Sequence, residues 1–156
     1  LRAKHAQEQW GKSGGSHAAE VLAFAREIGA TSVLDYGCGR ATLAPLLPGF
    51  LVGEYDPGIE GKDALPVPHG LVVATDVLEH IEPEKLSVVL EHIRSLAIKG
   101  VFAVIALSLS RVTLANGQNS HLIVESAEWW LEQLAANRFL ICRHELRKGL
   151  FVWMKT

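Results

Sequence analysis

Cysteine and long apolar stretches are scarce in this sequence, and each scarcity excludes a class of protein. The chain has two cysteines among its 156 residues, Cys38 and Cys142, and they do not have the spacing of metal ligands. We therefore expect neither a disulfide framework nor a zinc knuckle, and we expect the protein to be in a reducing compartment. The longest apolar runs, 71–74 and 101–107, are far shorter than the roughly 18 residues of a membrane span, so both are predicted to be buried strands.

An excess of charge of one sign is also lacking. The 15 basic and 17 acidic residues give a net charge of −2, and the Lys and Arg residues are scattered along the chain. We therefore expect no long nucleic acid as a partner, since such partners are bound through clustered basic residues. The N-terminus is polar and has no apolar segment, so we predict no signal peptide and a cytoplasmic location.

Apolar residues are plentiful and arranged in short segments. They make up 49% of the chain against 21% charged residues, which predicts one globular domain over residues 1–156. Segments with helical spacing alternate with fully apolar runs, which indicates an α/β, Rossmann-like, mostly parallel sheet with helices on both faces and a closing antiparallel hairpin. The predicted helices are 18–28, about 41–47, 82 up to Gly100 and one capped by Ser126; the predicted strands are 32–36, 50–55, 71–75, 101–107, 139–146 and 150–154.

The most informative segment is 33–41, Val-Leu-Asp-Tyr-Gly-Cys-Gly-Arg-Ala. A strand that runs into the turn Gly37-Cys38-Gly39 lets the backbone approach a ligand closely, because glycine has no Cβ. Asp35 lies two residues before the first glycine, and Asp56 follows the next predicted strand. A carboxylate at the second place can accept hydrogen bonds from both hydroxyls of a ribose.

Two kinds of nucleotide cofactor fit a turn of this type. A nicotinamide or flavin site prefers Gly-x-Gly-x-x-Gly, with a helix N-terminus directed at a pyrophosphate, and here the third glycine position holds Thr42. Adenosylmethionine has no phosphate and carries an α-amino group instead. Asp35 suits that cation, directly or through a water, so the turn favours adenosylmethionine.

The chain resembles the class I S-adenosylmethionine-dependent methyltransferases, of the type related to ubiquinone-biosynthesis enzymes, over nearly its whole length. Residues 33–41 resemble the first, glycine-rich motif of the family, and 54–57 resemble its second motif. Residues 62–66, 76–81 and 136–139 resemble three further segments, in the order of the family and near its spacing.

The resemblance implies a cofactor role for eleven residues. They are Asp35, Tyr36, Gly37, Cys38 and Gly39 around the methionine half, Tyr55 and Asp56 at the ribose and the adenine face, Asp63 and Ala64 at the adenine edge, and Asp76 and Val77 on the far side.

The sequence departs from the family at two places. The third family glycine is Ala41, a change that we expect the start of a helix to tolerate. Only 19 residues separate Asp56 from Asp76, where the family has a helix and another strand. We therefore expect a sheet shortened between the second and fourth family strands, with a shallower adenine pocket.

Two histidines are candidates for the base that removes a proton from a hydroxyl acceptor: His121 first and His80 second. A structural role is the alternative for each. In ubiquinone-pathway and RNA 3′-end 2′-O-methyltransferases a similar set beginning with Glu binds a divalent ion. Here the first position is Asp76, so we expect no metal; Glu79, His80 and His121 are the residues that would hold one.

Methyl transfer to an oxygen or nitrogen of an unidentified small-molecule, sugar or lipid acceptor is the function that the sequence favours. The rival is a non-catalytic Rossmann-like module or partner subunit that retains the cofactor. Residues 1–16, with Trp10 among them, are a candidate lid over the site. The oligomeric state is not encoded in any motif.

Overall fold

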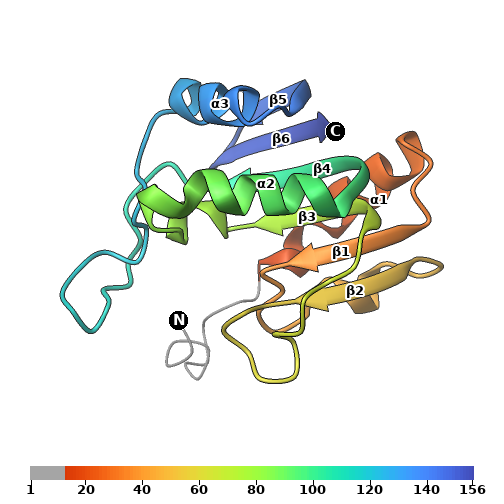
Figure 1. Ribbon diagram of the computed structural model, residues 1–156, viewed down its shortest axis with the longest axis horizontal. Helices are drawn as coiled ribbons and strands as arrows, with labels where there is room; N and C mark the ends of the chain where they lie inside the picture. Colours follow the sequence, from red (N-terminus) through yellow and green to blue (C-terminus); the bar gives the residue numbers. More distant parts are fainter. Residues whose placement is uncertain (1–12) are drawn as a thin grey trace.

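A computed structural model describes residues 13–156. Helix α1 is followed by three strands, β1 to β3, then by α2 and β4, and a helix and a hairpin complete the chain (Figure 1). The helices are α1 (Ala18–Glu27), α2 (Leu86–Leu96) and α3 (Ala127–Ala136); the strands are β1 (Ser32–Tyr36), β2 (Leu51–Tyr55), β3 (His69–Thr75), β4 (Ala97–Ile105), β5 (Leu140–Leu146) and β6 (Leu150–Lys155).

The strands form one six-stranded sheet in the order β2-β1-β3-β4-β6-β5. Strands β2, β1, β3 and β4 are parallel to one another, and β6 pairs antiparallel with both β4 and β5. The carboxyl ends of β1, β2 and β3 therefore meet at one edge. The predicted fold class, a Rossmann-like and mostly parallel sheet with a closing antiparallel hairpin, is confirmed.

Helices cover both faces of the sheet (Figure 1). Trp130 and Leu134 of α3 join Leu90 of α2 in a core against one face, and Phe24 of α1 packs with Phe102 of β4 against the other. The hydroxyl oxygen of Ser126 accepts a hydrogen bond from the Trp129 N–H at 3.2 Å, which confirms the predicted cap of α3. No helix in the described part of the chain is long and apolar enough to cross a membrane.

The segment between β2 and β3 contains neither a helix nor a strand. As expected, the sheet is shortened here, and β2 is left as its outer strand. Leu51, at the start of β2, is 73% exposed because no helix covers its side of the strand. This shortening opens the edge of the sheet beside the Asp56 turn.

The prediction of a helix over about 41–47 was wrong. The structure has one 3₁₀ turn there, Ala44–Leu46. Pro45 accounts for the difference, because its ring would clash with the carbonyl group four residues earlier in an α-helix. Ala41 consequently does not start a helix: it has φ = 56°, in the left-handed region that glycine favours.

The predicted boundary between the third long helix and the following strand was also wrong. Helix α2 ends at Leu96, and β4 begins at Ala97 and ends at Ile105, so Gly100 lies inside the strand. A Cβ at Gly100 would lie 2.6 Å from the carbonyl oxygen of Met154. The glycine is therefore required by close packing against β6, and it does not terminate the helix.

Candidate functional site

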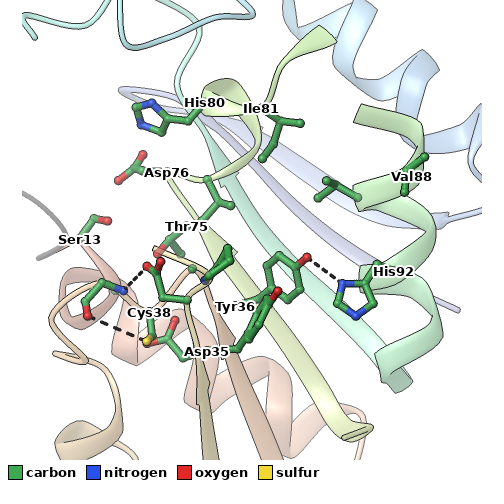
Figure 2. Close-up of a pocket in the computed structure, with 18 of the residues that line it drawn as sticks. Ser13, Asp35, Tyr36, Cys38, Thr75, Asp76, His80, Ile81, Val88 and His92 are labelled. Carbon is green, nitrogen blue, oxygen red and sulfur yellow. Dashed lines mark hydrogen bonds between the residues drawn. The ribbon is translucent and has the colours of Figure 1, made fainter. Parts of the chain in front are cut away.

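A cavity of about 770 Å³ opens at the carboxyl ends of β1, β2 and β3 and reaches α2 (Figure 2). We call its two polar regions the turn end and the histidine end. The turn end consists of Asp35, Gly37, Gly39 and Asp56, and the histidine end consists of Glu79, His80 and His121. Of these seven residues all except Glu79 line the cavity directly.

The glycine turn is locked to the neighbouring strand. The N–H groups of Gly37 and Cys38 both donate to the carbonyl oxygen of Tyr55, at 2.7 and 3.0 Å. Gly37 has φ = 77°, and a Cβ there would lie 2.5 Å from Cγ2 of Val77. Both constraints require glycine, so the turn brings bare backbone to the cavity wall.

Asp35 presents a buried carboxyl group to the cavity wall. Its residue is 2% exposed, and Oδ2 has no hydrogen-bond partner among the described residues. Burial first, and then the charges of Glu54 and Asp56, raise the pKa of Asp35 from 3.8 to about 7, against the opposing charge of Lys62. A buried acceptor of this kind is stabilised by a cationic hydrogen-bond donor from a ligand.

Asp56 connects the turn to the end of β2. Its Oδ2 accepts the Gly39 N–H at 3.1 Å, and its Oδ1 accepts the Gly58 N–H at 2.8 Å. A carboxylate oxygen can accept more than one hydrogen bond, so Asp56 can hold the turn and still receive ligand hydroxyls. It is buried, with 5% exposure, on the cavity wall.

Three rings form the wall of the cavity toward α2. The Tyr36 hydroxyl and Nδ1 of His92 share a hydrogen bond of 2.9 Å, drawn as a dashed line in Figure 2. The ring of Tyr55 lies 5.0 Å from that of Tyr36 and 6.1 Å from that of His92. Burial raises the pKa of Tyr36, so its hydroxyl stays protonated. The rings join β1 and β2 to α2 on the face that the missing helix leaves open.

The histidine end follows β3. The chain turns sharply at Asp76 (φ = 53°), and Glu79 and His80 belong to a one-turn 3₁₀ helix, Leu78–His80. Glu79 is fully buried: Oε1 accepts the Ala106 N–H at 3.0 Å, and Oε2 has no partner among the described residues. Burial, and then the charge of Asp76, raises the pKa of Glu79 to about 8.

Potential ligand atoms of Glu79, His80 and His121 all lie within 4.8 Å of one another. The rings of the two histidines are 4.8 Å apart at an angle of 76°. Nδ1 of His80 lies 2.6 Å from the Ser120 carbonyl oxygen, and Nδ1 of His121 lies 2.5 Å from that of Ser108. Since a carbonyl only accepts hydrogen bonds, each Nδ1 carries the hydrogen, and Nε2 of each neutral ring carries the lone pair.

Most of the residues expected at the site line the cavity, and three do not: Asp63, Ala64 and Glu79. Tyr36, Cys38, Tyr55, Asp76 and Val77 line it together with the turn-end residues, whereas Asp63 and Ala64 are exposed outside it and Leu65 takes their place. The pKa of the buried Cys38 thiol is raised to about 12, first by burial, which keeps the thiol protonated near neutral pH. Trp10 and residues 1–12 of the candidate lid lie outside the described residues.

The sequence reasoning missed the wall residues Val88 and His92, which line the cavity from α2. Ser13 and Gly14, which approach the turn end, lie within the segment 1–16 that was named as a candidate lid. His92 follows Val88 by four residues on α2, so the two lie on one face of that helix. The signal that this face borders a cavity was the shortened segment before Asp76, which removes a covering helix.

No family model matches the chain, and no curated protein sequence matches it. Solved structures do. Magnesium protoporphyrin IX methyltransferase from Synechocystis PCC 6803, with bound S-adenosylhomocysteine, is 18% identical with a TM-score of 0.65 over 91% of this chain and 83% of that chain. The 1,6-didemethyltoxoflavin-N1-methyltransferase of Burkholderia thailandensis, with bound 1,6-didemethyltoxoflavin and S-adenosylhomocysteine, is 16% identical with a TM-score of 0.69 over 93% and 79%.

Human N-acetylserotonin methyltransferase in complex with adenosylmethionine is a further match, 15% identical with a TM-score of 0.65 over 90% of this chain and 51% of that chain. The likeness shows the fold. This chain has the Rossmann-like α/β fold of class I methyltransferases. The narrower resemblance to ubiquinone-biosynthesis enzymes has no support from these three structures and stays a prediction.

Proposed function

We propose that this chain transfers a methyl group from S-adenosylmethionine to an oxygen or nitrogen atom of a small-molecule, sugar or lipid acceptor. The observation that carries the proposal is the buried carboxyl group of Asp35, which lies on the cavity wall beside the Gly37 turn and whose Oδ2 has no partner within residues 13–156. An α-amino group would supply the positive hydrogen-bond donor that this carboxylate needs.

The remaining turn-end residues suit the rest of the cofactor. Asp56 would accept the ribose hydroxyls, and the backbone at Gly37, Cys38 and Gly39 would lie against the methionine half. The rings of Tyr36 and Tyr55 would contact the base, with Leu65, rather than Asp63 or Ala64, at its edge. Asp76 and Val77 would close the far side. Two of the similar structures contain bound S-adenosylhomocysteine and a third contains adenosylmethionine, which supports this choice of ligand.

When bound, adenosylmethionine would supply an electrophilic methyl group to the acceptor's lone pair, with S-adenosylhomocysteine as the leaving group. His121, the first candidate for the base, would take the acceptor's proton on Nε2, with His80 as the second candidate. The cavity walls would exclude water and hold the acceptor in line with the methyl group.

A divalent ion is a second candidate role for the histidine end. The atoms of Glu79, His80 and His121 are close enough to share one ion, and in the part of the chain that the structure describes Oε2 of buried Glu79 has no partner. A carboxylate and two imidazoles suit Mn²⁺ or Zn²⁺, and the backbone carbonyls that fix both rings are typical supports of metal-binding histidines. Elemental analysis of the chelator-free protein tests this role, and protein that contains no divalent ion counts against it.

The rival to catalysis is a binding module that retains the cofactor. The shortened sheet favours it, and the ordered set of Glu79, His80 and His121 favours an enzyme. A small-molecule acceptor is suggested by the bound 1,6-didemethyltoxoflavin of the Burkholderia enzyme.

Calorimetric titration with S-adenosylhomocysteine and, separately, with NAD tests the cofactor. We expect binding of the first and not of the second. Binding of neither would refute the proposal and favour a scaffold role. Turnover of adenosylmethionine with a panel of hydroxyl and amine acceptors then distinguishes an enzyme from a binding module.

A further inference from the structure

The segment between β4 and α3 leaves the sheet and returns to the histidine end. Thr113 and Asn119 pair as an isolated antiparallel bridge, and the Ser120 N–H donates to the Val112 carbonyl oxygen at 3.0 Å. The returning limb, which we define as residues 119–123, therefore lies against the outgoing limb, residues 108–112. His121 is on the returning limb, so its position depends on how the two limbs are joined.

The side chain of Asn119 makes three hydrogen bonds, and two of them join the limbs. Its Oδ1 accepts the N–H of Ser110 at 3.0 Å and the N–H of His121 at 2.9 Å. Its Nδ2 donates to the carbonyl oxygen of Ser110 at 2.8 Å. One half-buried amide thus pairs with both backbone groups of Ser110 and holds the backbone of His121.

Both histidine rings rely on the same pair of limbs. His121 donates Nδ1–H to Ser108 on the outgoing limb, and His80 donates Nδ1–H to Ser120 on the returning limb. The Glu79 carbonyl oxygen accepts the N–H groups of Leu122 and Ile123 at 2.7 and 3.1 Å. A change in the spacing of the two limbs would therefore move the carbonyl oxygen that accepts the hydrogen bond from each ring.

We propose that Asn119 is the positioning residue of the histidine end, because its three hydrogen bonds place the Ser108 and Ser120 carbonyls where they hold His121 and His80 with the lone pair on Nε2. This inference rests on the proposed function, in which Nε2 either takes a proton or binds an ion. Both roles need a lone pair on that nitrogen. An imidazole whose Nδ1–H no longer donates to a carbonyl loses its preference for the tautomer with the lone pair on Nε2.

The test is nuclear magnetic resonance of the histidine ring nitrogens near pH 8, where ¹H–¹⁵N long-range correlations distinguish a nitrogen that carries hydrogen from one that carries a lone pair. We expect hydrogen on Nδ1 of both His80 and His121 in the unmodified protein. In Asn119→Ala the Nδ1–H form should no longer be the major form of His121. Asn119→Asp keeps an oxygen for both N–H groups and should give a smaller change.

Asn116→Ala is the matched control. Asn116 is an exposed amide in the same loop, and its hydrogen bonds go to Gln118 at the tip. We expect this variant to keep the histidine signals of the unmodified protein. All variants should bind S-adenosylhomocysteine equally, since Asn119 does not line the cavity.

Two failures are distinguishable. Asn119→Ala with unchanged ring nitrogens and unchanged S-adenosylhomocysteine affinity would overturn the positioning role alone. Failure of the unmodified protein to bind S-adenosylhomocysteine would overturn the proposed function. A shift of His121 in Asn116→Ala equal to that in Asn119→Ala would also overturn the inference, because loop disturbance in general would then suffice.

Discussion

The two ends of the cavity are built differently. The turn end stands on the ends of two neighbouring strands, β1 and β2, and hydrogen bonds to and from the backbone fix its glycine turn and the Asp56 side chain. The histidine end combines a 3₁₀ turn after β3 with a long loop after β4, and His80 and His121 depend on carbonyls of that loop. We infer that the turn end provides binding affinity and that the histidine end determines the reaction.

The largest expected effect separates the two ends. Replacing His121 by Ala should lower the rate of methyl transfer by about 10²–10⁴-fold, the usual contribution of a general base, while the affinity for S-adenosylhomocysteine changes little. Release of S-adenosylhomocysteine with an acceptor found by screening measures the rate, and calorimetry measures the affinity. His144→Ala, an exposed change on β5, is the control. An equal loss of affinity and rate would show that the two ends do not act separately.

Gly37→Ala should break the turn end. The alanine would have to keep the left-handed backbone conformation of Gly37, and its Cβ would lie 2.5 Å from Cγ2 of Val77. We therefore expect a loss of about 2–4 kcal/mol in the free energy of unfolding. Gly61→Ala is the matched control, because Gly61 has φ = 83° and nothing lies within 4 Å of an added Cβ. Chemical denaturation compares the two. Equal losses would mean that the contact with Val77 contributes nothing.

Asp35→Asn should weaken S-adenosylhomocysteine binding without disturbing the nucleoside half. Loss of one charge-assisted hydrogen bond is about 1.5–3 kcal/mol, or roughly 10–100-fold in affinity. 5′-Methylthioadenosine lacks the amino acid portion, so its affinity should stay the same. If Asp35→Asn weakened both ligands equally, Asp35 would not be the partner of the amino group.

The smallest effect concerns Ala41. A glycine there should relieve the left-handed strain and stabilise the protein by about 1 kcal/mol, after the entropy of the extra glycine is subtracted. Ala44→Gly, in the adjacent 3₁₀ turn, should destabilise it instead. Thermal unfolding of both variants provides the measurement. Destabilisation by Ala41→Gly would contradict the claim that the backbone of Ala41 is strained.

The difference between the two ends also explains what could be predicted from the sequence. The turn end is local: Asp35, Gly37 and Gly39 lie within five residues, so a strand pattern followed by glycines was enough to propose it. His121 is 41 positions after His80, and no local pattern indicates that the loop returns beside the 3₁₀ turn. That pairing was expected from the family resemblance alone.

The errors in secondary structure have equally specific causes. Pro45 lies inside the helix that was expected over 41–47, and its effect on the backbone was overlooked. Gly100 was interpreted as a helix end, whereas its role depends on the carbonyl of Met154, more than fifty residues away. Contacts across the sheet are not visible in a local pattern.

The most direct test of the proposed function is the affinity of the unmodified protein for S-adenosylhomocysteine at pH 8 and at pH 6. The pKa of Asp35 is raised to about 7, so the group is largely ionised at pH 8 and largely protonated at pH 6. Because the positive amino group of the ligand would bind the ionised form, we predict an affinity roughly tenfold lower at pH 6. Absence of binding, or an affinity that does not fall between pH 8 and pH 6, would contradict the assignment of Asp35 to the cofactor.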